Sequence, residues 1–208
     1  MSPRRYDQRL RAQSSQETRE RIVEALLDRL REAPAEPVSL DRVARTAGVS
    51  RSTVYVVFGS RAGLFEAAWA TLMRRSGYDR LLEAVSAEDA REHLRGGIRA
   101  GVEMFAANHE VARALYAMAR LDGGGDALGE AVQRMETERA AGMERVVGRL
   151  AGQGVLRPGL AERDAVQILR LLTSFDAFDQ LFAVGRLSTE EVARLLVETA
   201  ERTVCHPG

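Results

Sequence analysis

Apolar residues recur three and four positions apart through most of the chain, and this spacing constrains the fold more than any other feature. Because an α-helix turns once every 3.6 residues, such spacing places the apolar side chains on one face of a helix. Serine, glycine and proline interrupt the pattern where one helix should end and the next begin. No segment shows the period of two that is typical of a half-buried strand. The sequence therefore predicts an all-α protein.

The N-terminal third of the chain predicts four helices joined by short turns. Residues 1–14 are polar and are expected to be a disordered basic arm. Ser14–Glu17 has the form of a capping box, in which a serine hydroxyl and a glutamate side chain satisfy two free amides at a helix start. Pro34 and Pro37 are expected to end that helix at about Ala33. The helices predicted before residue 80 span 14–33, 39–47, 50–58 and 60–77.

The remainder of the chain keeps the helical pattern to its end. Ser188–Glu191 forms a second capping box. Gly123–Gly125 follows a predicted helix instead of a strand, so we expect a loop there and not a nucleotide-binding turn. The candidate helices in this part are 88–107, 110–121, 127–151, 162–184 and 188–204.

The stretch from Ser39 to Phe65 carries the most informative pattern. It holds two short predicted helices separated by an Ala-Gly turn, with the small Ala44 where they would cross, which is typical of a helix-turn-helix. Such a pair inserts its second helix into the major groove of DNA. A plain helical hairpin inside a bundle is the alternative. Helical periodicity directs Val49, Val54 and Phe58 to the core, and it leaves exposed Ser50, Arg51, Ser52, Thr53 and Tyr55.

This stretch resembles the TetR family of transcriptional regulators. The family couples its helix-turn-helix to a segment Tyr-x-x-Phe-x-Ser-Lys-x-x-Leu, and here the chain has Tyr55-Val-Val-Phe58-Gly-Ser60-Arg61-Ala-Gly-Leu64. The resemblance covers residues 17 to about 70. It implies a three-helix DNA-binding domain followed by a helical domain that dimerises and usually encloses an inducer pocket. We accordingly divide the chain into the arm (1–14), a helix-turn-helix domain (15–60), a linking helix (61–79) and a sensing and dimerisation domain (80–208).

The resemblance also implies roles for individual side chains. In the family, the residues that match Arg51, Ser52, Thr53 and Tyr55 contact DNA, and the pair that matches Ser60 and Arg61 holds a phosphate. Amides at a helix N-terminus attract anions, which is an independent reason for the phosphate role. Arg61 replaces the usual lysine, and Val57 replaces a customary polar residue, so the bases that are read are not defined. Ser50 and Arg42 complete the candidate DNA contacts, although Arg42 and Arg45 suit a solvated face better than a phosphate contact.

Charge is distributed unevenly along the chain. Residues 1–75 contain 14 arginines and 9 acidic residues, whereas residues 76–208 contain 16 arginines and 21 acidic residues. A basic N-terminal third suggests contact with a polyanion, although chance produces imbalances of this size. The arm either grips DNA or is simply disordered. No run of about 18–20 apolar residues and no signal peptide occur, so we expect a cytoplasmic protein without membrane contact.

An enzyme is the rival interpretation from another class. None of the histidines, His93, His109 and His206, lies four residues from another histidine. No Cys-x-x-Cys, His-Glu-x-x-His, P-loop or Gly-x-Ser-x-Gly motif occurs. The single cysteine, Cys205, excludes an intrachain disulfide. We therefore expect that the protein is not an enzyme and that it binds neither a cofactor nor a metal ion. An architectural DNA-binding protein without a ligand remains the other rival.

The last two predicted helices, 162–184 and 188–204, are apolar over more surface than one core-facing stripe needs. In the resembled family these helices form a four-helix bundle across a two-fold axis, which implies a homodimer on a palindromic operator. Asp176 and Asp179 interrupt the apolar pattern, and they either pair with arginine at the dimer interface or meet a cationic ligand.

The effector pocket rests on weaker signals, because each candidate side chain suits an ordinary core equally well. These candidates are mostly apolar, which favours a hydrophobic or aromatic effector. The function that the sequence predicts is a repressor that a small molecule releases from DNA, with a ligand-free DNA-binding regulator as the alternative. The candidate lining residues are Trp69, Met104, Phe105, Tyr116, Met118, Met135, Phe175 and Phe178.

Overall fold

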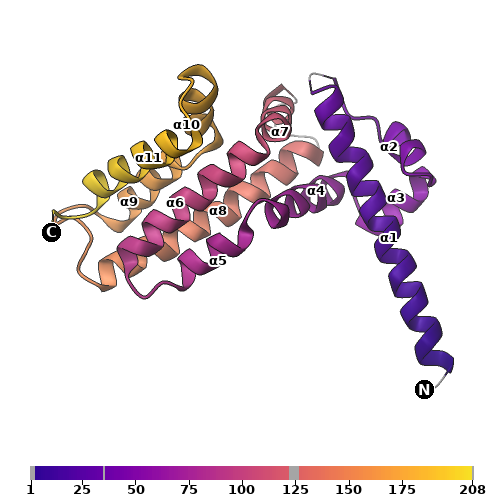
Figure 1. Ribbon diagram of the computed structural model, residues 1–208, viewed down its shortest axis with the longest axis horizontal. Helices are drawn as coiled ribbons and strands as arrows, with labels where there is room; N and C mark the ends of the chain where they lie inside the picture. The colour runs from indigo at the N-terminus through magenta and orange to yellow at the C-terminus, as the bar shows by residue number, and fades with distance from the viewer. Residues whose placement is uncertain (1–2, 35, 122–126, 208) are drawn as a thin grey trace. The chain divides into compact units, whose positions relative to one another are not determined.

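The computed structural model describes residues 3–34, 36–121 and 127–207. Within these ranges the secondary structure consists of helices (Figure 1). One isolated antiparallel bridge joins Leu156 to Cys205. The all-α prediction is confirmed. The helices are α1 (Pro3–Glu32), α2 (Leu40–Thr46), α3 (Arg51–Phe58), α4 (Arg61–Arg75), α5 (Tyr78–Ser86), α6 (Ala90–Ala107), α7 (His109–Leu121), α8 (Ala127–Gly152), α9 (Glu162–Leu172), α10 (Phe175–Asp179), a π-helix (Gln180–Val184) and α11 (Thr189–Val204).

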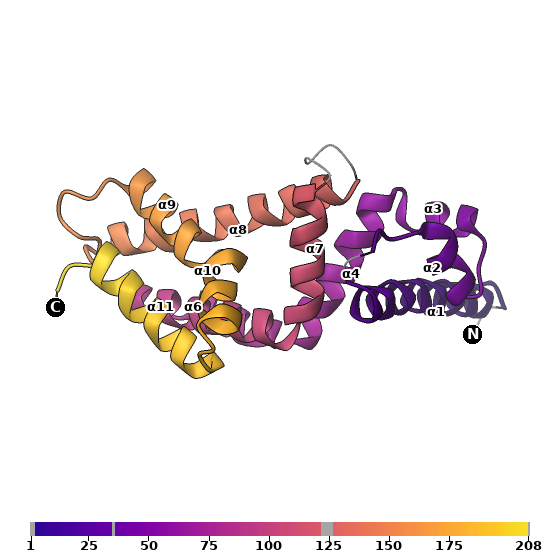
Figure 2. The same ribbon diagram turned by 90° about the horizontal axis from the view of Figure 1, so that it is seen from above.

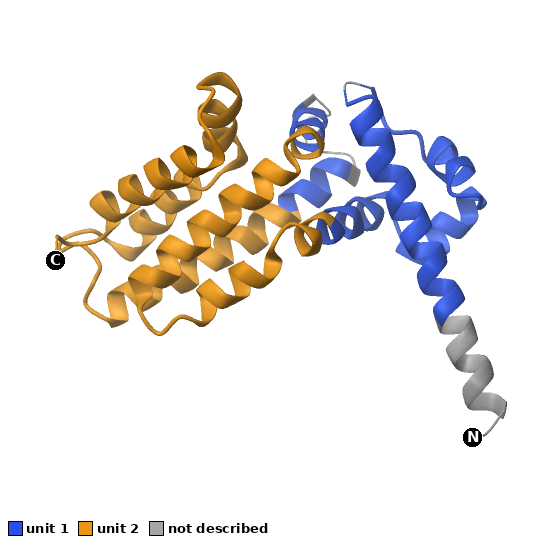
Figure 3. Ribbon diagram, in the orientation of Figure 1, with its two compact units in different colours: residues 1–71, 113–133 blue, residues 72–112, 134–208 orange. Residues whose placement is uncertain are grey.

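The chain divides into two compact units (Figure 3). Unit 1 combines residues 1–71 with residues 113–133, and unit 2 combines residues 72–112 with residues 134–208. Three helices, α4, α7 and α8, therefore contribute residues to both units. None of the described helices is long and apolar enough to cross a membrane.

Unit 1 is built on α1, with α2 and α3 against one side of it (Figure 1). The buried face of α1 carries Ile22, Leu26 and Leu30, which recur every four residues and are at most 1% exposed. Arg29 is also buried on α1, where its guanidinium donates to the Ala33 carbonyl at 2.7 Å and to the Glu36 carboxylate at 2.8 Å. A buried cation that is satisfied in this way ties the α1–α2 connection to the helix it follows.

The N-terminal helix begins earlier than the sequence predicts. Its backbone is helical from Pro3 onward, through the segment that we expected to be a disordered arm. Proline suits the first position of a helix, and arginine, glutamine and leucine are good helix formers. The predicted capping box at Ser14–Glu17 consequently lies inside α1, where the Thr18 hydroxyl donates to the Ser14 carbonyl at 2.8 Å.

Unit 2 contains a helix that the sequence does not separate from its neighbours. Gly77, in the left-handed region with φ of 93°, ends the linking segment, and α5 follows it directly. Helix α5 packs on α6 so closely that a Cβ added at Gly96 would lie only 2.7 Å from the Cβ of Ala84. Tyr78, Leu82 and Val85 of α5 are exposed, while Ala84 is buried against α6.

The predicted helix 162–184 is in fact three segments. Thr173 and Ser174 separate α9 from α10, and the Ser174 hydroxyl both accepts from the Ala177 amide and donates to the Leu171 carbonyl. Hydroxyl side chains compete with helical hydrogen bonds in this way. The chain then continues into the π-helix before α11, whose predicted capping box between Ser188 and Glu191 is confirmed.

The C-terminal end of unit 2 is held by side chains from α6 and α8. Helix α6 lies beside α11 in both views (Figures 1 and 2). Between them Arg95 pairs with Glu201 at 2.7 Å. Arg149 of α8 donates to the carbonyls of Val85 and Glu88, so it closes the turn between α5 and α6. Its guanidinium also lies 3.1 Å from Nδ1 of the buried His93.

Candidate nucleic-acid interface

The turn between α2 and α3 requires a glycine. Gly48 has φ of 67°, a conformation that strains residues with a side chain, and the Val49 amide then bonds back to the Ala44 carbonyl at 3.0 Å. Ala44 is buried at this crossing, as its small size predicts. The predicted pair of helices around a tight turn is therefore present in the structure.

The N-terminus of α3 carries a cluster of hydroxyl groups. The Ser50 side chain accepts from the Thr53 amide at 3.1 Å, which is the capping bond that the sequence predicts. Its hydroxyl also lies 2.7 Å from the Ser52 hydroxyl and 2.8 Å from the Thr53 hydroxyl. Ser50 and Ser52 are exposed and Thr53 is half-buried. This end of the helix presents several donors and acceptors to its surroundings.

Arg51 extends from the same turn of α3 and is held from two directions. Its guanidinium lies 3.2 Å from the Asp41 carboxylate on α2 and stands 5.9 Å from the centre of the Tyr55 ring. Tyr55 first, and then Asp41, raise the pKa of Arg51 above its ordinary value. The side chain remains about half exposed, so it is a charged donor that is oriented but still available.

The middle of α3 separates cleanly into a buried and an exposed side. Val54 is buried, while Val49 and Phe58 are half-buried, broadly as periodicity predicts. Tyr55 is 39% exposed, and Val56 is 84% exposed. Sequence reasoning missed Val56 as a candidate contact, although it follows Ser52 by four residues and so shares its face of the helix.

The motif that follows α3 is explained by close backbone packing. Gly59 ends the helix with φ of 73°, and the Ser60 hydroxyl accepts from the Gly63 amide at 3.0 Å. A Cβ at Gly63 would lie only 2.3 Å from the Phe58 carbonyl oxygen. Only glycine therefore allows α4 to begin this close to the end of α3.

Two arginines fix α3 and α4 from inside unit 1. Arg19 stacks on the Phe58 ring at 4.6 Å and donates to the Val57 carbonyl at 3.2 Å, so it caps the end of α3. Arg61 donates to the Val38 carbonyl at 2.9 Å and stands over the Phe65 ring at 5.6 Å. The Arg61 guanidinium thus faces inward, whereas Ser60 and Arg42 are exposed.

A family model described as "Bacterial regulatory proteins, tetR family" matches residues 22–68, which are the residues that build this surface. This part of the chain is similar to the TetR family. No curated protein matches the sequence.

Solved structures of bacterial regulators have a similar fold over most of this chain. One from Rhodococcus sp. has 20% identity, covers 88% of this chain and 96% of its own, and superposes with a TM-score of 0.69. NalD from Pseudomonas aeruginosa, the secondary repressor of the MexAB-OprM multidrug efflux pump, has 23% identity, covers 93% and 98%, and gives 0.68. FadR from Bacillus halodurans, a fatty acid degradation regulator, has 15% identity, covers 88% and 97%, and gives 0.70. At these identities the likeness shows the fold alone.

The predicted pocket residues fall into both units. Trp69, Tyr116 and Met118 belong to unit 1, and the other five belong to unit 2. In unit 2 the Phe105 ring lies 5.4 Å from that of Phe175 and 5.5 Å from that of Phe178, and all three rings are buried. Met104 is buried and Met135 is half-buried. The structure thus joins three predicted residues in one aromatic cluster.

The aromatic cluster also contains a histidine–aspartate contact that the sequence does not predict. His109 Nε2 lies 2.6 Å from the Asp179 carboxylate, and its ring contacts those of Phe178 and Phe182 at 6.1 and 5.3 Å. The partner of Asp179 is thus a histidine of the same protomer, and neither an arginine across an interface nor a cationic ligand is needed. The pairing is formed over 70 positions of sequence, so no local pattern reveals it.

Proposed function

We propose that the protein is a repressor that binds a palindromic operator as a homodimer and leaves it when a small hydrophobic or aromatic molecule binds. In this proposal residues 15–60 form the DNA-binding domain, residues 61–79 the linking helix, and residues 80–208 the sensing and dimerisation domain. The arrangement of α3 is the single observation that carries the proposal. Its buried side anchors it to unit 1, and its exposed side presents hydroxyls, a guanidinium and an apolar side chain together.

These groups match what base edges in a major groove offer. Arginine donates two hydrogen bonds to guanine, hydroxyls suit several bases, and an apolar side chain contacts the thymine methyl group. We assign base reading to Arg51, Ser52, Thr53 and Tyr55, and we add Val56 because of its exposure. Asp41 has a positioning role in this scheme, because it holds the Arg51 guanidinium in one orientation.

Phosphate contacts are assigned to the rim of this surface. Ser60 and the first amides of α4 stand at a helix N-terminus, which favours an anion. Arg61 contributes its positive charge from behind this terminus, since its guanidinium bonds the Val38 carbonyl. Ser50 and the exposed Arg42 complete the set. Contacts of this kind position the protein without reading sequence.

The effector is assigned to the sensing domain on more general grounds. The candidate residues there are aromatic or contain sulfur, which suits an apolar ligand. KstR2 of Mycobacterium tuberculosis, which shares the fold at 15% identity, is a ketosteroid regulator, and FadR regulates fatty acid degradation. The mutual packing of Phe105, Phe175 and Phe178 favours a second candidate function, a DNA-binding regulator that works without a small molecule.

Selection of genomic fragments by the purified full-length protein tests the proposal. We expect enrichment of a palindromic site, with binding that weakens steeply as salt rises. A Ser52→Asn variant should enrich a different half-site, because the new side chain prefers adenine. The matched control, Ser86→Asn on the exposed surface of α5, should select the original site. Absence of any enriched sequence for the wild-type protein at low salt would contradict the proposed function.

A further inference from the structure

The C-terminal end of α3 is held by a side chain from another helix. Arg19 of α1 donates from Nη1 to the Val57 carbonyl at 3.2 Å, across 38 positions of sequence. Its guanidinium also lies over the Phe58 ring, 4.6 Å from the ring centre. Carbonyls in the last turn of a helix have no partner within the helix, and a cation is favourable beside them. Arg19 therefore fastens the end of α3 to α1.

The other attachments of α3 leave its tilt weakly determined. Val54 is the one fully buried residue of this helix. The turn before α3 is held where the Val49 amide bonds to the Ala44 carbonyl. The close contact at Gly63 joins the far end of α3 to α4, and Arg19 joins that end to α1. An eight-residue helix is about 12 Å long, so a shift of about 1 Å at one end tilts it by about 5°.

Two arginines of α1 differ in how firmly they are bound. Arg29 is 5% exposed, and it donates to the Ala33 carbonyl and the Glu36 carboxylate. Arg19 is half-buried and forms no salt bridge with a carboxylate of the described residues. Loss of one partly exposed hydrogen bond costs a fold little. The importance of Arg19 therefore depends on the helix that it holds.

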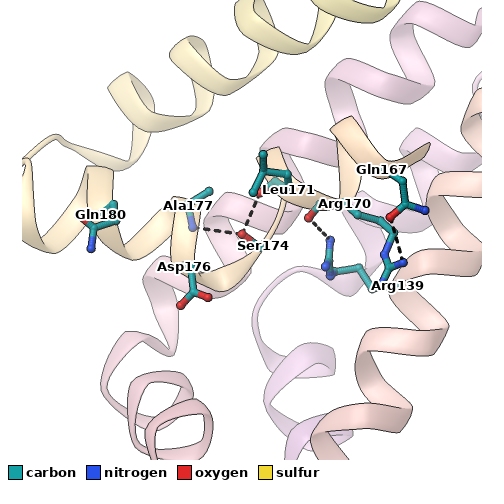
Figure 4. A pocket seen from close by; sticks show the side chains of 8 residues that line it. All are labelled: Arg139, Gln167, Arg170, Leu171, Ser174, Asp176, Ala177 and Gln180. Atoms are coloured by element: carbon teal, nitrogen blue, oxygen red, sulfur yellow. Dashed lines mark hydrogen bonds between the residues drawn. The ribbon is translucent and has the colours of Figure 1, made fainter. Parts of the chain in front are cut away.

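Unit 2 contains a stronger version of the same contact. An open pocket of about 470 Å³ lies between α8 and the α9–α10 segment, and we call it the α9–α10 groove (Figure 4). There Arg139 of α8 donates to the Arg170 carbonyl at 3.0 Å, in the last turn of α9, and to the Thr173 hydroxyl at 2.8 Å. Its Nε and Nη2 both donate to Glu136. Arg139 is thus fixed by a closed network, whereas Arg19 holds α3 by one hydrogen bond and one ring.

We infer that Arg19 is a positioning residue for DNA recognition, which sets the tilt at which α3 presents Arg51 and Ser52 to the bases. The inference rests on the proposed DNA-binding function of α3. Arg19 contacts no base in this scheme, because it acts through Val57 and Phe58. Hydrogen bonds to base edges depend on direction, so a tilt of a few degrees should weaken them. The attraction between arginines and phosphates carries no sequence information and should persist.

Substitutions in the full-length protein separate positioning from charge. Arg19→Met keeps an apolar stem and removes the guanidinium, and Arg21→Met removes the same charge from an exposed position on α1. Both should lower affinity for random DNA by about twofold to threefold. Discrimination between the selected operator and random DNA should fall by about tenfold in Arg19→Met alone, as measured by competition binding. Arg163→Met on α9, where the side chain is 90% exposed, should match the wild-type protein in both values.

Two further variants separate positioning from a general loss of stability. Arg29→Met should lower the melting temperature more than Arg19→Met does, because it removes a buried network, but it should leave discrimination unaltered. Arg19→Lys keeps a charged donor for the Val57 carbonyl and should restore most of the discrimination.

The inference would be overturned if Arg19→Met discriminated as well as Arg21→Met, or if Arg29→Met lost discrimination to the same extent. Failure of Arg19→Lys to recover any discrimination would also overturn it. A wild-type protein that bound operator and random DNA equally would instead overturn the proposed function on which the inference rests.

Discussion

The exposed face of α3 in unit 1 and the α9–α10 groove in unit 2 both present an arginine, but they treat it differently. Arg51 finds a carboxylate and an aromatic ring within its own unit, and it remains about half exposed. Arg170 keeps a buried Nε without an acceptor among the described residues. The first arrangement suits a surface that must be stable in water and still bind reversibly. The second keeps a donor away from water without a hydrogen bond, which lowers stability.

The two regions also differ in the interactions that determine their backbone conformation. Around α3, Gly48 and Gly59 have positive φ, and at Gly63 there is no room for a Cβ, so glycines determine the path of the chain. Around the groove, the α9–α10 break depends on hydroxyl groups and on Arg139, which reaches it from α8. Unit 1 is therefore expected to be sensitive to small changes of shape at its turns, and unit 2 to changes of charge.

The largest effect should come from adding one methyl group at the α3–α4 junction. Gly63→Ala places a Cβ 2.3 Å from the Phe58 carbonyl oxygen, and this overlap should lower the free energy of unfolding by about 3 kcal/mol. Gly97→Ala is the matched control in unit 2, because it also lies within a helix but meets no atom within 4 Å. It should raise stability by about 0.5–1 kcal/mol. Equal effects of both variants in urea unfolding would show that the junction is not tightly packed.

The next effect concerns the exposed arginine of unit 1. Arg51→Ala should weaken binding to the selected operator by about 2 kcal/mol, or about thirtyfold, through loss of a guanine contact. Thermal stability should change little, because the exposed pair with Asp41 contributes little to folding. Titration of labelled duplexes provides the measurement, and Arg163→Ala is the control. A similar loss on random DNA would assign Arg51 to phosphate contact instead.

A smaller effect concerns how the free energy of unfolding depends on pH. Unit 2 should be the more sensitive unit, because all three histidines lie in it. Burial first, and then the charges of Arg149 and Arg145, lower the pKa of His93 below its ordinary value. Well above pH 6.5 neither the folded nor the unfolded state binds the proton. As the pH falls through this value the unfolded state binds it first, so the free energy of unfolding decreases by at most about 1.4 kcal/mol per pH unit.

Urea unfolding at pH 7.5 and pH 5.5 measures this loss. His93→Gln should reduce the difference between the two pH values, since it removes the titrating ring. His206→Gln, at the half-buried C-terminal end, should leave the difference largely in place. A wild-type protein that is equally stable at both pH values would contradict the neutral state assigned to His93.

The smallest effect should come from Asp41, which touches Arg51 but is not expected to touch a base. Asp41→Asn removes a negative charge near the phosphates and frees the guanidinium. Affinity for random DNA should increase by about threefold, while discrimination between operator and random DNA should decrease by a similar factor. Competition binding measures both values. If the variant discriminated between operator and random DNA as well as the wild-type protein does, Asp41 would have no positioning role.

Interactions within a few residues of sequence were sufficient to predict α2 and α3. They were insufficient to predict much of unit 2. The capping hydroxyl of Ser50 and the left-handed glycine at position 48 act within a few residues, so the sequence alone predicts the helix-turn-helix. The break at Thr173 combines local hydrogen bonds of the Ser174 hydroxyl with one from Arg139 of α8. The His109–Asp179 pair depends on a contact between helices that are distant in sequence. The inward orientation of Arg61 has the same origin, because its acceptor is the Val38 carbonyl, 23 positions away.

Burial likewise limits what the sequence predicts about the effector. Phe105, Phe175 and Phe178 were named as pocket candidates, and in the structure they form a packed cluster. A ring that lines a pocket and a ring that fills a core follow the same helical period, so periodicity does not separate them. The assignment of these residues to an effector pocket stays a prediction.

The central claim is that the N-terminal half of α3 enters the major groove, and site-directed DNA cleavage tests it most directly. A Ser52→Cys variant accepts a DNA-cleaving iron chelate at this exposed position, whereas the natural Cys205 is only 2% exposed. On the selected operator we predict cleavage in the major groove of two half-sites, centred about 34–36 Å apart or at a multiple of that distance. The same chelate on an Arg163→Cys variant should cut neither. Bound operator that is left uncut by the chelate at position 52, or cut equally from position 163, would contradict the account.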